Sequence, residues 1–173
     1  MQTVNTVIIY ILLAISSVGG SNLWYPGKVP TDTAQNNSVE SSKPLEPRSA
    51  CIPVEYVKNY DGDTMTVNIL GISLLEDRGR FIGVDTDEKG QTQRAKKATE
   101  FTRQRLQNSE IYLEFDTRLR DKYDRLLAYV WLEDSTGRRS MLNRQLLAKD
   151  LAELMIIPPD DEFEKFLRKY IPN

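Results

Sequence analysis

The uninterrupted apolar run from Leu126 to Leu132 constrains the fold most strongly. A short run without polar residues predicts a strand that is covered on both faces. Residues 65–69 and 111–115 alternate between apolar and polar side chains, which predicts two further strands, and residues 81–84 predict another. The chain therefore has to build a sheet that encloses part of its own core.

Helices are expected between and after these strands. From Thr92 to Asn108, apolar residues recur near one side of a helix, with charged residues elsewhere. Residues 141–149 and 160–170 predict two more helices. This order of elements over residues 52–170 predicts a small α+β domain with a β-barrel or a curled sheet.

The N-terminus carries an apolar run from Val7 to Val18. A membrane-spanning helix needs about 20 such residues, whereas a signal-peptide core is shorter and is followed by small residues. We expect residues 1–20 to be a signal peptide, which predicts a secreted, extracellular protein. An uncleaved anchor at residues 7–18 facing outward and a cytosolic chain remain alternatives, because the only positive charge before the run is the α-amino group.

Residues 21–50 are rich in Pro, Ser, Thr, Asn and Gln and have no apolar periodicity. This composition predicts a flexible, disordered linker, which places the folded domain at residues 51–173. We expect that domain to fold without the linker. Cys51 is the only cysteine, so an intrachain disulfide and a four-cysteine metal site are excluded. A buried or idle thiol is favoured there over a lipid anchor or a nucleophile.

The sequence contains no histidine, which excludes Ser-His-Asp triads and histidine-ligated zinc. Any chemistry must use carboxylates, lysines, arginines, hydroxyls or a metal held by oxygen ligands. With 23 basic and 25 acidic residues, the net charge is −2. The sequence therefore lacks the basic footprint that is typical of nucleic-acid binders.

Three charged stretches lie where strands meet turns, and the second and third each have two interpretations. Residues 61–64, Asp-Gly-Asp-Thr, are typical of a β-turn in which Asp61 forms an Asx turn. Residues 80–88 place an arginine before three carboxylates, which favours either a site for a hard cation such as Ca²⁺ or Mg²⁺ or a solvated acidic turn. Residues 121–125, Asp-Lys-Tyr-Asp-Arg, end in an arginine suited to a surface ion pair or to a phosphate.

In this order, and together with residues 127–130 and 141–143, these stretches resemble the staphylococcal nuclease (thermonuclease) family over residues 52–170. The resemblance implies an OB-fold, a five-stranded β-barrel with about three helices. It also implies hydrolysis of phosphodiester bonds in DNA and RNA that leaves 3′-phosphates, with single-stranded or unpaired substrates preferred. We expect a monomer, and no protein partner is implied.

The resemblance further implies a Ca²⁺ cofactor. Its ligands would be the carboxylates of Asp63 and Asp85 and the main-chain carbonyl of Thr86. A divalent ion next to a phosphodiester would offset the negative charge that opposes attack by a nucleophile.

Five other residues take roles from the resemblance. Arg80 and Arg125 match the two arginines that bind the scissile phosphate, and Glu88 matches the glutamate that activates or positions the attacking water. Lys122 and Tyr123 match residues that contact a terminal phosphate. None of these roles needs histidine, so the composition and the implied mechanism agree.

The departures from the family pattern include two acidic residues. Asp87 stands where the family usually has proline, and we expect its side chain to point away from the metal. Asp124 stands where glycine is common, and it could pair with Arg125. The alternatives to an enzyme are a catalytically inactive OB-fold module that binds nucleic acid or another protein, and a surface domain stabilised by Ca²⁺. Retention of every implied catalytic and metal residue favours the enzyme.

Overall fold

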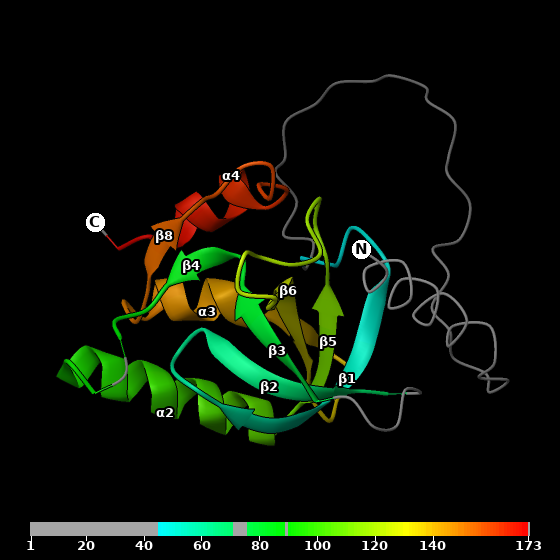
Figure 1. Ribbon diagram of the computed structural model, residues 1–173, viewed down its shortest axis with the longest axis horizontal. Coiled ribbons are helices and arrows are strands. Elements are labelled where there is room, and N and C mark those ends of the chain that lie inside the picture. Colours follow the sequence, from blue (N-terminus) through cyan, green and yellow to red (C-terminus); the bar gives the residue numbers. More distant parts are fainter. Residues whose placement is uncertain (1–44, 71–75, 89, 173) are drawn as a thin grey trace, which may run out of the picture. The chain divides into compact units, whose positions relative to one another are not determined.

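The structure, a computed structural model, describes residues 45–70, 76–88 and 90–172. The expected signal peptide and most of the expected linker lie outside these ranges. Within them, no helix has the length and apolar character needed to cross a membrane. The strands and helices of this part of the chain, shown in Figure 1, are β1 Cys51–Asn59, β2 Thr64–Ile69, β3 Glu76–Phe81, β4 Gly83–Asp85, α2 Gln93–Gln107, β5 Glu110–Glu114, β6 Leu126–Glu133, β7 Arg139–Met141, α3 Leu142–Ala148, β8 Glu153–Met155, α4 Glu164–Leu167 and the 3₁₀ helix η1 Arg168–Tyr170.

Five strands form a closed barrel in the order β3-β2-β1-β5-β6, and a parallel pairing between β3 and β6 closes it. β7 extends the sheet beyond β6. Every residue of β6 from Leu126 to Leu132 is buried, as the apolar run predicts, because one face fills the barrel and the helices cover the other. The OB-fold with its five-stranded barrel and three helices is therefore confirmed.

Helix α2 lies against the turn that carries Asp-Gly-Asp-Thr. Its N-cap, Thr92, accepts a hydrogen bond from the amide of Ala95 at 2.9 Å, and its buried stripe includes Ala98 and Thr102. The hydroxyl of Thr102 donates to the Gly62 carbonyl at 2.6 Å. The helix thus fixes the turn at residues 61–64 in addition to covering the barrel, and Figure 1 shows it running along one side of the strands.

Gly62 has no room for a side chain. A Cβ atom there would lie 2.7 Å from Ala98 Cβ and 2.7 Å from Thr86 Cγ2. We expect Gly62→Ala to destabilise the domain by about 1–3 kcal/mol, because α2 or the chain around Thr86 must move. Urea denaturation measures the loss. Gly79→Ala is the control, because the nearest atom to its Cβ is 3.7 Å away. Equal stability of the two variants would contradict this expectation.

The strand expected at residues 81–84 is two strands. β3 ends at Phe81, and β4 begins at Gly83, where φ is +79°. Glycine reaches this left-handed conformation without strain, so the chain turns out of the barrel. β4 then pairs with β8, with Asp85 opposite Glu153. Asp85 therefore belongs to a small separate sheet.

Asn143 holds this corner to the barrel. Its buried side chain accepts a hydrogen bond from the amide of Val130 at 2.9 Å and donates to the carbonyl of Ile82 at 2.7 Å. These bonds satisfy the carbonyl of Ile82, which lies between β3 and β4, and the amide of Val130, which lies within β6. Asn143 thereby fixes the direction in which β4 leaves the barrel.

The prediction of a helix at residues 160–170 is wrong for residues 160–163. Helix α4 begins only at Glu164, and η1 ends at Tyr170. The buried carboxylate of Asp160 accepts bonds from the amide and Nε of Arg118, at 2.8 and 2.7 Å. This long-range pairing holds residues 157–160 in a turn in place of a first helical turn.

The compact unit Leu45–Asn173 includes a short segment, residues 45–50, that precedes β1. Glu114, 1% exposed, accepts bonds through Oε1 from the amides of Arg48 and Ser49 at 2.8 and 2.7 Å. Its Oε2 accepts from Trp131 Nε1 at 2.7 Å. A buried carboxylate of β5 thus takes two of its donors from this segment.

Cys51 follows this segment and is a free thiol. Burial raises its pKa to about 12, and the nearby Glu114 acts in the same direction. A thiol with so high a pKa stays protonated near neutral pH, which disfavours a nucleophile.

Candidate functional site

The carboxylates of Asp63 and Asp85 converge on one guanidinium. Arg80 Nη2 donates to Asp85 Oδ1 at 2.6 Å, and Nη1 is in ion-pair contact with Asp63 Oδ1 without hydrogen-bond geometry. Asp63 lies in the turn before β2 and is 3% exposed, whereas the Asp85 side chain is 52% exposed. The site therefore has a buried wall at Asp63 and an open side at Asp85.

Thr86 completes this cluster. Its amide donates to Asp63 Oδ2 at 2.6 Å, and its buried Oγ1 has no hydrogen-bond partner. Within the described part of the chain, its carbonyl accepts no hydrogen bond either. The cluster thus contains two carboxylates and two unused neutral oxygens, the kind of ligand that Ca²⁺ takes in sets of about six to eight, water included.

Asp61 adds a third negative charge beside the cluster. Its Oδ1 accepts the amide of Asp63 at 3.1 Å, which is the Asx turn expected from the sequence. Burial raises the pKa of Asp61 to about 6, and repulsion from Asp63 adds to the effect. Three carboxylates against the single guanidinium of Arg80 leave an excess of negative charge, which fits a cation at this place.

Among the described residues, no three acidic side chains lie close enough together to hold a metal by themselves. The expected ligand set has only two carboxylates and a backbone carbonyl, so it does not require such a group. The residues present fit a calcium ion whose remaining positions are filled by water.

The side chains of Glu88 and Asp87 differ in their contacts. Glu88 is exposed, and its side chain has no hydrogen bond or ion pair within the described ranges. Asp87 turns toward α2, where its Oδ2 accepts from Thr92 Oγ1 at 2.5 Å and its Oδ1 pairs with Arg94 Nη1 at 3.3 Å. Asp87 therefore makes no contact with the carboxylates of the cluster, as expected.

Arg125 is held by Asp121 and not by Asp124. Its Nε and Nη2 lie 2.7 and 2.6 Å from Asp121 Oδ2, and its amide donates to Asp121 Oδ1 at 3.0 Å. Asp124 adopts a φ of +63°, and its Oδ1 lies 3.6 Å from Arg120 Nε. The pairing of Asp124 with Arg125 that the sequence left open does not occur.

Lys122 and Tyr123 form the exposed tip of this turn. Tyr123 is 61% exposed, and the Lys122 ammonium and the Arg125 guanidinium lie 5.0 and 5.3 Å from its ring centre. The amide of Tyr123 donates to Asp121 Oδ1 at 2.9 Å. One partly buried aspartate thus organises a turn that presents two cations and an aromatic ring to solvent.

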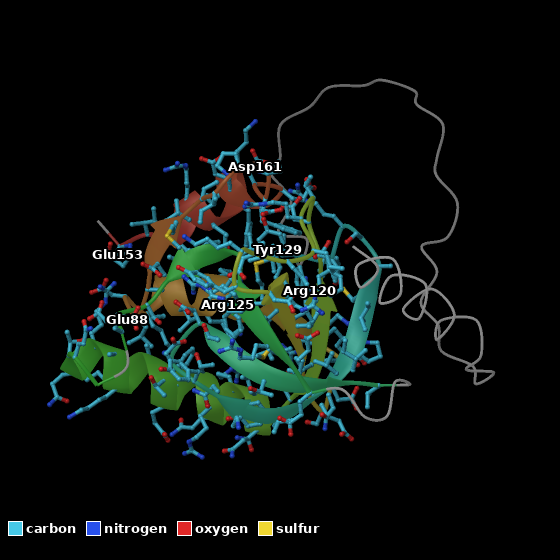
Figure 2. All side chains as sticks on the ribbon, viewed as in Figure 1. Glu88, Arg120, Arg125, Tyr129, Glu153 and Asp161 are labelled. Atoms are coloured by element: carbon cyan, nitrogen blue, oxygen red, sulfur yellow. The ribbon has the colours of Figure 1, made fainter. Side chains whose placement is uncertain are left out.

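The pairing of β3 with β6 relates the two arginines. Arg80 lies opposite Leu127, and Arg125 precedes Leu127 by two positions. Arg125 directly precedes β6, and continuing the alternation of that strand by one position would place its side chain on the same face as Arg80. Figure 2 shows Arg125 near the barrel strands and Glu88 close to the start of α2.

The structure thus unites Asp63, Asp85, Arg80 and Thr86 by direct contacts. Arg125, Lys122 and Tyr123 form a second group around Asp121. Glu88 touches neither group. Sequence reasoning assigned no role to Asp121, Arg94 or Asn143. Asp121 lies four residues before Arg125, a spacing that could have indicated the pair, whereas the partners of Arg94 and Asn143 are distant in the sequence.

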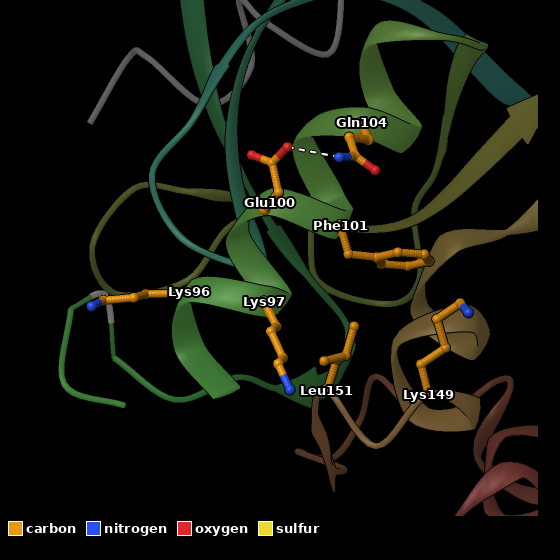
Figure 3. Close-up of a pocket in the computed structure, with 7 residues that line it drawn as sticks. All are labelled: Lys96, Lys97, Glu100, Phe101, Gln104, Lys149 and Leu151. Atoms are coloured by element: carbon orange, nitrogen blue, oxygen red, sulfur yellow. Dashed lines mark hydrogen bonds between the residues drawn. The ribbon is translucent and has the colours of Figure 1, made fainter. Parts of the chain in front are cut away.

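A shallow groove of about 690 Å³ lies elsewhere, between α2 and the end of α3. Figure 3 shows its lining, which is Lys96, Lys97, Glu100, Phe101, Gln104, Lys149 and Leu151. It contains none of the expected site residues.

The chain matches the model of a known protein family. The model of the staphylococcal nuclease homologue family matches residues 78–170, more than half of the chain, so the protein belongs to this family. The match includes Arg80, Asp85, Glu88 and Arg125, and it begins after Asp63.

Two curated relatives are thermonucleases. The chain is 38% identical to the thermonuclease of Staphylococcus intermedius over 108 residues, which cover 60% of each protein. It is 32% identical to that of Staphylococcus hyicus over 114 residues, 63% of each. The chain thus spans about 60% of the length of the curated relatives that it matches.

Proposed function

We propose that this protein is an exported, Ca²⁺-dependent nuclease that hydrolyses phosphodiester bonds of DNA and RNA and leaves 3′-phosphates. The observation that carries the proposal is the contact of two carboxylates with Arg80, which lies on β3 beside β6, the strand that Arg125 directly precedes. Membership of the staphylococcal nuclease family and similarity to two thermonucleases support it.

Asp63, Asp85 and the Thr86 carbonyl would hold the calcium ion. When bound, the ion supplies positive charge beside the phosphate and its developing negative charge. The exposed side of Asp85 is where a substrate phosphate has access to this part of the site.

The two arginines bind the phosphate. Asp121 fixes the plane of the Arg125 guanidinium through Nε and Nη2, which leaves Nη1 without a bond to the described residues. Arg80 would face the same side of the barrel. Guanidinium donors aimed at a phosphate stabilise the charge that accumulates on its oxygens in the transition state.

Glu88 activates or positions the attacking water. Its exposed carboxylate has no competing partner within the described residues. Water oxygen bonds to phosphorus, the P–O5′ bond breaks, and the departing 5′-oxygen gains a proton, which leaves the phosphate on the 3′-side. Lys122 and Tyr123 contact a terminal phosphate, and single-stranded or unpaired substrates are preferred.

The calcium requirement is tested with single-stranded DNA and the purified chain. We expect cleavage with Ca²⁺, loss of cleavage with a chelator and recovery when Ca²⁺ is restored. Asp85→Ala should need a higher Ca²⁺ concentration, because one of two carboxylate ligands is lost. Calcium titration of activity, together with calorimetric titration of Ca²⁺ in the absence of DNA, measures this shift.

Asp134→Ala is the matched control, because Asp134 lies in the turn after β6, away from the cluster. Cleavage that persists in chelator would contradict the calcium requirement. Binding of DNA without any cleavage would identify the chain as an inactive OB-fold module, the alternative left open by the sequence. Binding of Ca²⁺ alone would identify a calcium-stabilised domain.

A further inference from the structure

The position of Glu88 depends on its neighbours in the chain. Its side chain has no partner among the described residues, and its carbonyl accepts only the amide of Gln91, at 3.1 Å. A carboxylate that must act on one water molecule needs a fixed location. The contacts of the neighbouring residues in the chain must therefore fix the location of the Glu88 carboxylate.

The segment is anchored at two points. Before Glu88, the Thr86 amide donates to Asp63 Oδ2 at 2.6 Å. Next to Glu88, Asp87 accepts from Thr92 Oγ1 at 2.5 Å and pairs with Arg94 Nη1 at 3.3 Å. Since Thr92 is also the N-cap of α2, the second anchor joins the segment to the start of that helix.

Arg94 also contacts residues that are distant in the sequence, at the end of α3 and in β8. Its Nε donates to the Asp150 carbonyl at 2.9 Å, and its Nη1 lies 3.4 Å from Glu153 Oε1. Glu153 lies in β8, opposite Asp85 in β4. The guanidinium therefore connects the segment of Glu88 to the small sheet that carries Asp85.

We propose that Arg94 is a positioning residue that holds Glu88 in place through Asp87. This inference rests on the proposed role of Glu88 in hydrolysis. Each ion pair is partly exposed and contributes little alone, because solvent screens it. The planar fork of arginine, however, contacts the loop, the Asp150 carbonyl and β8 together, which restricts where the loop lies.

The kinetic test uses Arg94→Ala and a short single-stranded oligonucleotide. We expect kcat to fall by about 10- to 100-fold, because a displaced catalytic group loses its geometry, while KM changes by less than about threefold. Arg94→Lys should recover only part of kcat, since lysine keeps the charge and loses the fork. Arg103→Ala is the matched control, because Arg103 lies on the same helix and, among the described residues, its side chain forms hydrogen bonds only with Glu100 and Gln107.

A double-mutant cycle separates positioning from general loss of structure. If Arg94 acts through Glu88, Arg94→Ala should add almost nothing to the defect of Glu88→Ala. An equal loss of kcat in the presence and absence of Glu88 would overturn the proposal. A thermal unfolding midpoint close to that of Arg103→Ala would show that the domain remains folded.

Amide hydrogen exchange tests the same proposal without activity. Exchange of the peptide that spans residues 86–91 should accelerate in Arg94→Ala and remain unchanged in Arg103→Ala. Unchanged exchange in Arg94→Ala would overturn the positioning role. A parent protein that does not cleave, or a Glu88→Ala variant with full activity, would instead overturn the proposed function, and the exchange experiment would still decide whether Arg94 holds the loop.

Discussion

Arg80→Lys and Arg125→Lys should each reduce kcat/KM for DNA cleavage by about 10²- to 10³-fold, the usual cost of removing a transition-state donor. Lysine keeps the positive charge in both variants. It loses the planar fork that presents two N–H groups to phosphate oxygens. At Arg125 it also loses the paired contact of Nε and Nη2 with Asp121, which orients the guanidinium.

Arg139→Lys is a suitable control for both variants. Arg139 pairs with Glu133 at 2.7 Å, and its side chain is 20% exposed, close to the 24% of Arg125. Initial rates on single-stranded DNA at saturating Ca²⁺ measure the difference. Cleavage by a lysine variant within about threefold of the parent would mean that the arginine is an ion-pair partner and not a phosphate ligand.

Removal of residues 45–50 should destabilise the domain by about 3–5 kcal/mol, because it leaves a buried carboxylate without most of its hydrogen-bond donors. Glu114 would lose the amides of Arg48 and Ser49 and the Ser49 hydroxyl, and would keep only Trp131. The contact of the Arg48 guanidinium with the Phe163 ring, at 4.6 Å, would also disappear. A chain of residues 45–173 should retain the stability of the full chain.

Urea unfolding of residues 45–173 and 51–173 measures this loss. The matched control repeats the comparison with Glu114→Met in both chains. Once the carboxylate is replaced by an apolar side chain of similar length, the truncation should cost far less, because no buried charge is left unpaired. Equal stabilities of the chains 45–173 and 51–173 would mean that residues 45–50 do not belong to the folded domain.

Local patterns in the sequence predicted the parts of the fold that depend on neighbouring residues. The apolar run of β6 and the amphipathic spacing of α2 each report burial along one element, so both were found with nearly correct bounds. Closure of the barrel followed only from the family resemblance. Periodicity states which face of a strand is buried, but not which strand lies beside it.

The contacts that orient the site could not be predicted in the same way. Gly83 separates β3 from β4 through a positive φ, which an apolar run does not reveal. Arg94 reaches Glu153 across 59 positions, and Asn143 reaches Ile82 across 61. The residues next to an arginine or asparagine in the sequence do not indicate which distant residue it will contact. That partner is determined only when the chain folds.

The departure of β4 from the barrel divides the site between two sheets of unequal size. Asp63 is anchored beside the long barrel strands, whereas Asp85 sits on a pair of three-residue strands. A substitution that loosens the small pair would shift one carboxylate and leave the other in place. At the proposed calcium site, substitutions in β4 or β8 would therefore change ion affinity with little change in the melting temperature set by the barrel.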